Sequence, residues 1–290
     1  KFTAAHEQSR TTGVSMRTSE VEVRFYQQLG GSLRIRTPAC YHAEVDADTA
    51  RFVLLLEDIS PAQQGDQMSG CSVDEAASAL EEMAKLHAPR WGDRSLESIE
   101  WLNRRNEQQL ALLEAIYPTF FEGFVDRYGA TLPEPITEVG QVLFPRIGPY
   151  LKYVPPLRAV QHADFRVDNL LFGGPDGRVA VVDWQTVTLG PPVADLSYFL
   201  GGSITTEDRR VHEESLVHHY HEHLVAGGVE GYGFDELWAD YGRYAYSGLL
   251  MAVGAAMMVE RTERGDAMFL AMAHRAAVHA LDMDSASMLT

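Results

Sequence analysis

The chain has 290 residues, of which 46% are hydrophobic and 22% are charged, a composition typical of a globular protein with a sizeable core. Its net charge of -17 at pH 7 argues against nucleic acid or an anionic membrane as a partner, because both are polyanions. Its two cysteines, Cys40 and Cys71, have neither disulfide-framework nor metal-ligand spacing, so we expect a cytoplasmic protein. The longest apolar stretch, 245–259, is shorter than the ~20 residues of a membrane-spanning helix and predicts a buried helix.

The first part of the chain predicts one helix and two strands. The polar segment 4–18 is typical of a loop, and the helix predicted over 19–30 ends at a glycine. The apolar runs 40–45 and 51–56 predict strands, with an acidic turn at 46–48 between them.

Helices are predicted for most of the remaining chain. Ser72 and Glu75 have the spacing of a capping box, which predicts a helix with Leu80 and His87 on its apolar face. Further helices are predicted over 96–116, 136–144, 207–226, 234–259 and 266–281, with Pro118 and Pro145 as stops.

Three histidines share one face of the helix predicted over 207–226. His212, His219 and His223 are spaced by seven and four residues, so they could hold a metal ion. No carboxylate or cysteine pattern completes such a site, and a solvated histidine-rich face is the preferred interpretation.

The candidate catalytic residues lie at a predicted hairpin, which falls between these helices along the chain. Two apolar runs, 170–172 and 179–182, flank a glycine-rich turn. Asp164 and Asn169 precede the first strand and Asp183 ends the second, so two carboxylates and one amide oxygen should meet at one edge. Hard oxygen ligands of this kind suit Mg²⁺, and a carboxylate beside them can orient an attacking hydroxyl. A chance motif with an Asp in a turn is the alternative interpretation.

The residues 161–172, Gln-His-Ala-Asp-Phe-Arg-Val-Asp-Asn-Leu-Leu-Phe, and 183–185, Asp-Trp-Gln, resemble the aminoglycoside phosphotransferases and the choline-kinase-like small-molecule kinases, including their ecdysteroid-kinase-like branch. Protein kinases have Arg after the His and Phe-Gly after the metal Asp, and this chain has neither. The resemblance implies an α+β, protein-kinase-like bilobal fold. It also implies use of ATP and Mg²⁺.

The resemblance implies roles for residues of the motif. Asp164 would be the catalytic base or hydroxyl orienter, and Asn169 and Asp183 would be the metal ligands. We expect His162 to be a structural histidine that braces the loop by hydrogen bonds. Ala163 stands where these kinases usually have Gly, which predicts an ordinary backbone there.

Asp195, after the second strand of the hairpin, would brace the catalytic loop through its backbone in the same family. A helix acid favoured by the helix dipole is the alternative for this residue.

The amino-terminal lobe is expected to bind the nucleotide. The resemblance implies that Lys1 is the phosphate lysine and Glu22 its ion-pair partner, with Glu20 as a competitor for Glu22. Alternatively, Lys1 has no such role and is only the first residue of the sequence. Because two strands and a nucleotide-covering loop precede the lysine in such kinases, we expect the amino-terminal lobe of this chain to be incomplete at its start.

The resemblance also implies a hinge at Leu56, Glu57, Asp58 and Ile59, whose backbone would hydrogen-bond adenine. A plain core strand that ends in a polar turn is the alternative. The expected domains are an amino-terminal lobe with its hinge over 1–59 and a helical carboxyl-terminal lobe over 60–290, with the catalytic hairpin at 160–185.

The sequence thus predicts a kinase that phosphorylates a hydroxyl group of a small molecule. An aminoglycoside, a choline-like amine, a steroid-like alcohol and a hydroxyacyl compound remain open as acceptors, because function lies in the acceptor pocket and not in the fold. The residues Tyr244, Tyr246, Leu250, Met257 and Met258 would suit a lipophilic alcohol, with helix packing as the alternative. A catalytically silent nucleotide-binding protein is the rival from another class.

Overall fold

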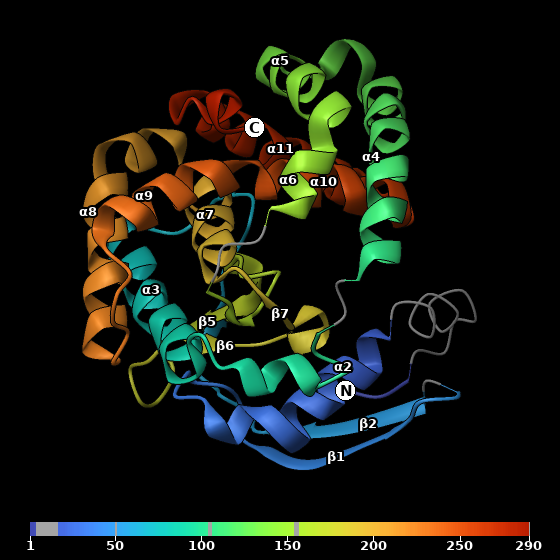
Figure 1. Ribbon diagram of the computed structural model, residues 1–290. Coiled ribbons are helices and arrows are strands. Elements are labelled where there is room, and N and C mark those ends of the chain that lie inside the picture. Colours follow the sequence, from blue (N-terminus) through green and yellow to red (C-terminus); the bar gives the residue numbers. More distant parts are fainter. Residues whose placement is uncertain (4–16, 50, 104–105, 154–156, 290) are drawn as a thin grey trace.

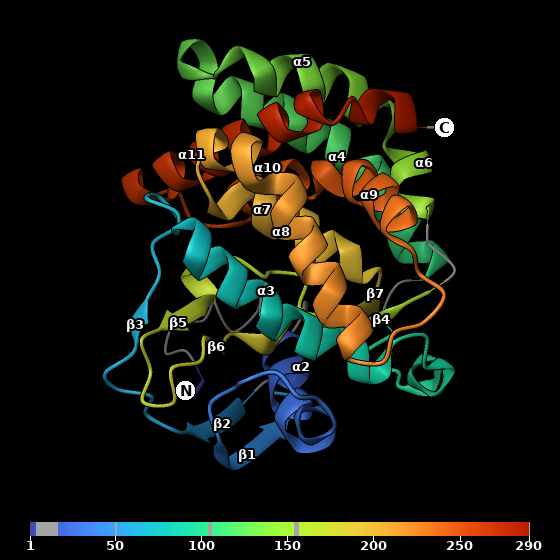
Figure 2. The same ribbon diagram turned by 90° about the vertical axis from the view of Figure 1, so that its left-hand side faces the viewer.

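The computed structural model describes residues 1–3, 17–49, 51–103, 106–153 and 157–289. Most of the segment predicted as a polar loop, residues 4–16, lies outside the described residues. A small lobe with a two-stranded sheet and helix α2 lies below a larger lobe made mainly of helices (Figures 1 and 2). The predicted α+β bilobal architecture is confirmed.

The small lobe is built on the antiparallel strands β1 (Cys40–Asp46) and β2 (Arg51–Leu56), which match the predicted strands closely. Helix α2 (Thr18–Arg24) packs on this pair and continues into a π-helical turn at Phe25–Leu29. The first residues add to the edge of β2, because the amino group of Lys1 donates to Leu54 O (2.8 Å) and Leu54 N donates to Lys1 O (2.9 Å).

The larger lobe also contains short strands. Strand β5 pairs antiparallel with β6, which gives the predicted hairpin, and also with β3 from the segment that leaves the small lobe. Strand β4 precedes the predicted catalytic loop (residues 162–169) and pairs with β7. The bounds are β3 Gln63–Gln64, β4 Ala159–Gln161, β5 Leu170–Phe172, β6 Ala180–Val181 and β7 Thr188–Gly190.

Helices make up the rest of the larger lobe, and α3 and α8 lie side by side in both views (Figures 1 and 2). The helix bounds are α3 Val73–His87, α4 Glu107–Tyr128, α5 Glu134–Leu143, α6 Ile147–Lys152, α7 Pro192–Ser203, α8 Thr206–Ala226, α9 Phe234–Arg243, α10 Ser247–Met258 and α11 Glu263–Asp282. The predicted capping box is present at the start of α3. Among the described residues, no helix combines the length and apolar content needed to cross a bilayer.

The bounds predicted for the helix over 96–116 were wrong at both ends. Helix α4 begins at Glu107, where the side chain of Asn106 accepts a hydrogen bond from Gln109 N (2.9 Å). The chain before it is drawn toward β7, because Leu102 O accepts hydrogen bonds from Leu189 N and from the hydroxyl of Thr188.

Pro118 does not stop helix α4 but lies inside it, although a proline there removes one backbone hydrogen bond at a cost of ~3 kcal/mol. The residues beyond it, Phe121 and Phe124, are buried in the core. Burying each such side chain stabilises by about 1.5–3 kcal/mol, so tertiary packing outweighs the local preference of proline.

The helix predicted over 234–259 is two helices, α9 and α10, joined by a 3₁₀ turn at Tyr244–Tyr246. The hydroxyl of Ser197 donates to Tyr241 O (2.9 Å), and the hydroxyl of Ser285 donates to Gly242 O (2.7 Å). These hydroxyl groups give partners to two carbonyl groups at the carboxyl end of α9, where carbonyls lack partners within the helix.

Candidate active site

The open end of the hairpin brings together the three polar residues that the motif predicted. Asn169 Nδ2 lies 3.0 Å from Asp164 Oδ2 and 2.9 Å from Asp164 O, which leaves the amide oxygen of Asn169 as the atom that a cation would use. Asp183, at the end of the second strand, is tied to the same loop because Val182 N donates to Asn169 O (3.0 Å). Two carboxylates and an amide thus lie at one edge, a donor set that fits Mg²⁺.

Lys1 joins the small lobe to this edge. Its Nζ lies 2.7 Å from Glu22 Oε1 and 2.7 Å from Asp183 Oδ1. Burial lowers the pKa of Lys1, but the charges of Glu22 and Asp183 outweigh it, so that the pKa is raised overall and the ammonium form is favoured. The competing carboxylate, Glu20, pairs with Arg17 and Arg24 instead.

Asp164 accepts hydrogen bonds from three different side chains. Its Oδ1 accepts from the hydroxyl of Tyr198 (2.9 Å) and lies 3.3 Å from Arg166 Nε, while its Oδ2 accepts from Asn169 Nδ2 (3.0 Å) and from Arg166 Nε (3.5 Å). Burial raises the pKa of Asp164 above its ordinary value, and the positive charge of Arg166 offsets part of this effect. The carboxylate is therefore held in one orientation and is more basic than an exposed Asp.

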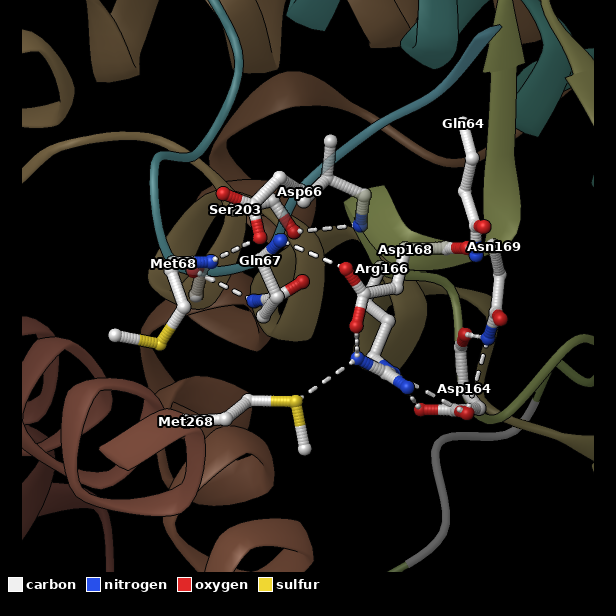
Figure 3. Close-up of polar contacts among 12 residues, drawn as sticks. Gln64, Asp66, Gln67, Met68, Asp164, Arg166, Asp168, Asn169, Ser203 and Met268 are labelled. Carbon is white, nitrogen blue, oxygen red and sulfur yellow. Dashed lines mark hydrogen bonds and ion pairs between the residues drawn. The ribbon is translucent and has the colours of Figure 1, made fainter. Parts of the chain in front are cut away.

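Arg166 extends this network toward the segment that leaves the small lobe (Figure 3). Its Nη1 lies 2.5 Å from Asp168 Oδ2, and Asp168 Oδ1 accepts from Gln67 N (2.7 Å). The same guanidinium faces the sulfur of Met268 on α11 (3.7 Å). Arg166 therefore places a fixed positive charge between the catalytic loop and the helical lobe.

His162 and Asp195 hold the backbone of the catalytic loop. His162 Nδ1 accepts from Asp164 N (3.3 Å) and its Nε2 donates to Val182 O (3.1 Å), an arrangement that fits a neutral imidazole. One oxygen of Asp195 accepts from His162 N (2.7 Å) and the other from Ala163 N (2.9 Å). Both residues are buried, and the predicted bracing roles are confirmed.

The prediction of an ordinary backbone at Ala163 was wrong, because its φ is +64°. This left-handed conformation brings the amide groups of residues 162 and 163 onto the single carboxylate of Asp195. An L-residue in this region is strained by about 1–2 kcal/mol, so the two hydrogen bonds to Asp195 hold a conformation that Gly would adopt freely.

Ala163→Gly is therefore expected to raise the free energy of unfolding by about 0.5–1 kcal/mol, since relief of strain exceeds the added entropy of the unfolded chain. Urea unfolding of the two proteins measures this difference. Ala130→Gly, at an exposed position without a positive φ, is the control and should lower stability. A loss of stability in Ala163→Gly as large as in the control would contradict the argument.

The predicted hinge connects β2 to β3. Some of its backbone groups and side chains already make hydrogen bonds to other residues of the protein. Glu57 N donates to Ala39 O (2.8 Å), and its carboxylate makes a paired contact with the guanidinium of Arg36. Asp58 accepts from Ser60, and Ile59 O accepts from Ala62 N (3.0 Å). The side chains of this segment thus stabilise the turn after Leu56, and its role in adenine binding stays a prediction.

The apolar wall predicted for a lipophilic acceptor is mostly core. Tyr244, Tyr246 and Leu250 are buried, and the rings of both tyrosines pack against Tyr150. Met258 is 52% exposed at the end of α10. The prediction that these side chains line a pocket was wrong for the three buried ones, which hold the helices together.

Sequence reasoning missed several residues that touch the catalytic loop. Arg166 and Asp168 lie within the motif itself, where an Arg and an Asp two residues apart could have indicated an ion pair. Tyr198 and His87 come from helices distant in the sequence, and no local pattern points to their contacts. His87 Nε2 lies 3.3 Å from Asp195 Oδ2, so α3 supports the residue that braces the loop.

Comparison with solved structures finds this fold in small-molecule kinases. The choline kinase LicA from Streptococcus pneumoniae shares 15% identity with this chain, with a TM-score of 0.53 over 96% of this chain and 85% of the kinase. The GDP complex of aminoglycoside 2′-phosphotransferase-IIIa shares 13% identity, with a TM-score of 0.52 over 94% and 84% of the two chains. At these identities the likeness shows a common fold.

Comparison by sequence gives short matches to curated proteins and a long match to a family model. Acyl-CoA dehydrogenase family member 11 from Gallus gallus is 51% identical over 41 residues, which are 14% of this chain and 5% of that protein. The model of the ecdysteroid kinase-like family matches residues 18–228, well over half of the chain and including the whole predicted catalytic hairpin. The chain belongs to the ecdysteroid kinase-like family.

Proposed function

We propose that this protein transfers the γ-phosphoryl group of ATP, in the presence of Mg²⁺, to a hydroxyl group of a small molecule. The observation that carries this proposal is the meeting of Lys1, Glu22, Asp164, Asn169 and Asp183 at one edge, although they span most of the sequence. Phosphoryl transfer depends mainly on positioning and electrostatic stabilisation, which these groups can supply. A nucleoside diphosphate in the related aminoglycoside kinase supports nucleotide use.

Each residue has a role in the proposed reaction. Asp164 accepts the proton of the acceptor hydroxyl and orients its oxygen toward the phosphorus. Lys1 binds phosphate oxygens while Glu22 holds its ammonium group in place. Asn169 and Asp183 would hold Mg²⁺, which neutralises phosphate charge when it is bound.

We also propose that adenine binds at the hinge through the carbonyl of Glu57 and the amide of Ile59. The opposite groups of these two residues, Glu57 N and Ile59 O, already pair with Ala39 and Ala62. Because backbone groups would make these hydrogen bonds, adenine binding would depend little on which side chains stand at these positions.

Asp183→Asn is expected to weaken nucleotide binding in the presence of Mg²⁺ and to leave binding without Mg²⁺ nearly unchanged, because a neutral amide holds the cation less well. Calorimetric titration of ATP and GTP, with and without Mg²⁺, measures both quantities. It also separates a catalytically silent fold from a competent one. Asp126→Asn, at an exposed carboxylate on α4, is the control. If Mg²⁺-dependent affinity stays the same in Asp183→Asn, Asp183 does not hold the metal.

The acceptor is proposed to be an alcohol that is neutral or negatively charged. Arg166 lies 3.3 Å from Asp164 and 2.5 Å from Asp168 and keeps its charge at all relevant pH values, so a cationic group beside the reacting hydroxyl would find both carboxylates already paired. The uncharged thioether of Met268 lies 3.7 Å from the same guanidinium. A polycationic aminoglycoside fits this environment less well.

The test is a screen of alcohols for acceptor-dependent ATP consumption. Steroid-like alcohols, hydroxyacyl compounds, choline and aminoglycosides form its arms. The hydroxyacyl arm is included because a matched relative is named as an acyl-CoA dehydrogenase family member. Efficient phosphorylation of aminoglycosides alone would refute the charge argument while leaving the kinase proposal intact. No consumption with any acceptor, together with no Mg²⁺-dependent nucleotide binding, would refute the kinase proposal itself.

Arg166→Gln is expected to move the acid limb of the pH profile of kcat/KM to higher pH. Removing the guanidinium leaves the effect of burial unopposed, so the pKa of Asp164 rises further and its carboxylate is protonated at a higher pH. Arg94→Gln, which makes the same charge change at an exposed side chain, should leave the limb in place. An unmoved limb in Arg166→Gln would show that Arg166 does not set the basicity of Asp164.

A further inference from the structure

A carboxylate from a different helix lies beside the histidine-rich face of α8. His219 and His223 are one turn apart on α8, and Glu81 reaches them from α3, which packs alongside. One ligand atom from each residue lies within 4.8 Å of the other two. The third histidine of the predicted face, His212, is not part of this group. The sequence offered no carboxylate because Glu81 is far away along the chain.

The hydrogen bonds of these three residues are incomplete. His219 Nε2 is buried and has no hydrogen-bond partner among the described residues, and Glu81 Oε1 lies 3.7 Å from it, too far for a hydrogen bond. The rings of His219 and His223 meet edge to face with centroids 4.5 Å apart. A buried nitrogen without a partner costs free energy, and a shared cation would satisfy it.

We propose that Glu81, His219 and His223 bind a divalent transition metal, with Zn²⁺ as the ion that suits them. Two imidazole nitrogens and one carboxylate oxygen are ligands that Zn²⁺ takes at ~2.0–2.2 Å, whereas Mg²⁺ prefers oxygen alone. Ligand atoms of such a site are about 3.3 Å apart, so small side-chain rotations close it. Glu81 and His219 remain 41% and 31% exposed, which leaves room for water as the fourth ligand.

The ion would link α3 to α8 close to the residues that support the catalytic loop. Tyr220, next to His219, has its hydroxyl 2.7 Å from His87 Nδ1, and His87 contacts Asp195. The metal would therefore stabilise the same helix pair that supports the residue bracing the loop. This role does not depend on the proposed kinase activity.

The test uses the tag-free chain, stripped of metal and kept in excess Mg²⁺ so that oxygen-ligand sites are filled. Calorimetric titration with Zn²⁺ measures affinity, and thermal unfolding measures the change in Tm. Visible absorption of the Co²⁺ form reports tetrahedral coordination. Glu81→Gln and His223→Ala remove one ligand each, and His212→Ala removes a histidine from the same helix outside the group.

We expect one equivalent of Zn²⁺ to bind and to raise Tm, because a ligand that binds only the folded state stabilises it. Glu81→Gln and His223→Ala should lower the affinity by at least ~10-fold, since even outer-shell partners of a metal are worth 10–100-fold, and His212→Ala should bind as the parent does. Because Glu81→Gln keeps the shape of the side chain, it serves even if His223→Ala unfolds. No Zn²⁺ binding by the parent, or equal losses in His212→Ala and Glu81→Gln, would overturn the proposal and leave a simple Glu81–His219 ion pair.

Discussion

Asp164→Ala is expected to lower kcat for phosphoryl transfer by ~10²–10⁴, the range for a positioned acid-base group. The carboxylate accepts hydrogen bonds from Tyr198 and Asn169 and faces Arg166, so its orientation is fixed before any substrate binds. Alanine removes the group that accepts the hydroxyl proton in the proposed reaction. Nucleotide binding should change little, because Asp183 and Lys1 remain.

Steady-state kinetics with the best acceptor of the screen measures this loss. Asp164→Asn keeps the shape of the side chain and should be nearly as inactive, which separates lost basicity from lost packing. Asp126→Ala, at an exposed carboxylate on α4, is the matched control and should keep full activity. A kcat within threefold (~0.65 kcal/mol) of the parent in Asp164→Ala would reject the assignment.

Asp195→Ala is expected to lower the free energy of unfolding by about 3 kcal/mol or more. The substitution leaves the buried amide of His162 and the partly buried amide of Ala163 without their acceptor, and an unsatisfied buried group costs about 1–3 kcal/mol. It also removes the partner of His87 Nε2 and lets the strained backbone at Ala163 relax. The catalytic loop should therefore lose its position as well as its stability.

Urea unfolding measures this effect, and Asp195→Asn should lose less stability because its amide oxygen still accepts one hydrogen bond. Asp235→Ala, at an acid in the first turn of α9, tests the alternative that Asp195 acts mainly on the helix dipole. Equal losses in Asp195→Ala and Asp235→Ala would favour that alternative over bracing.

The sequence alone determined the features that depend on residues close together in the chain. The catalytic motif around Asp164, the hairpin that follows it and the two strands of the small lobe were all predicted closely. The capping box of Ser72 and Glu75 was found in the same way. Hydrophobic period and turn chemistry act over a few residues, so these patterns can be read directly.

Local rules failed where distant parts of the chain outweighed them. Pro118 remains inside α4 because aromatic residues beyond it are buried. The predicted helix 234–259 is interrupted after α9, where hydroxyl groups of Ser197 and Ser285 donate to the last carbonyl groups. Ala163 takes a positive φ because the carboxylate of Asp195 holds its amide. In each case a tertiary contact supplies more free energy than the local preference costs.

Only the tertiary structure decided which side chains meet at the candidate sites. It chose Glu22 over Glu20 as the partner of Lys1 and placed Arg166 beside Asp164. It also brought Glu81 to His219, residues that lie on different helices. Such meetings follow from how helices and strands pack, and the packing depends on the burial of the whole core, which no short stretch of sequence contains.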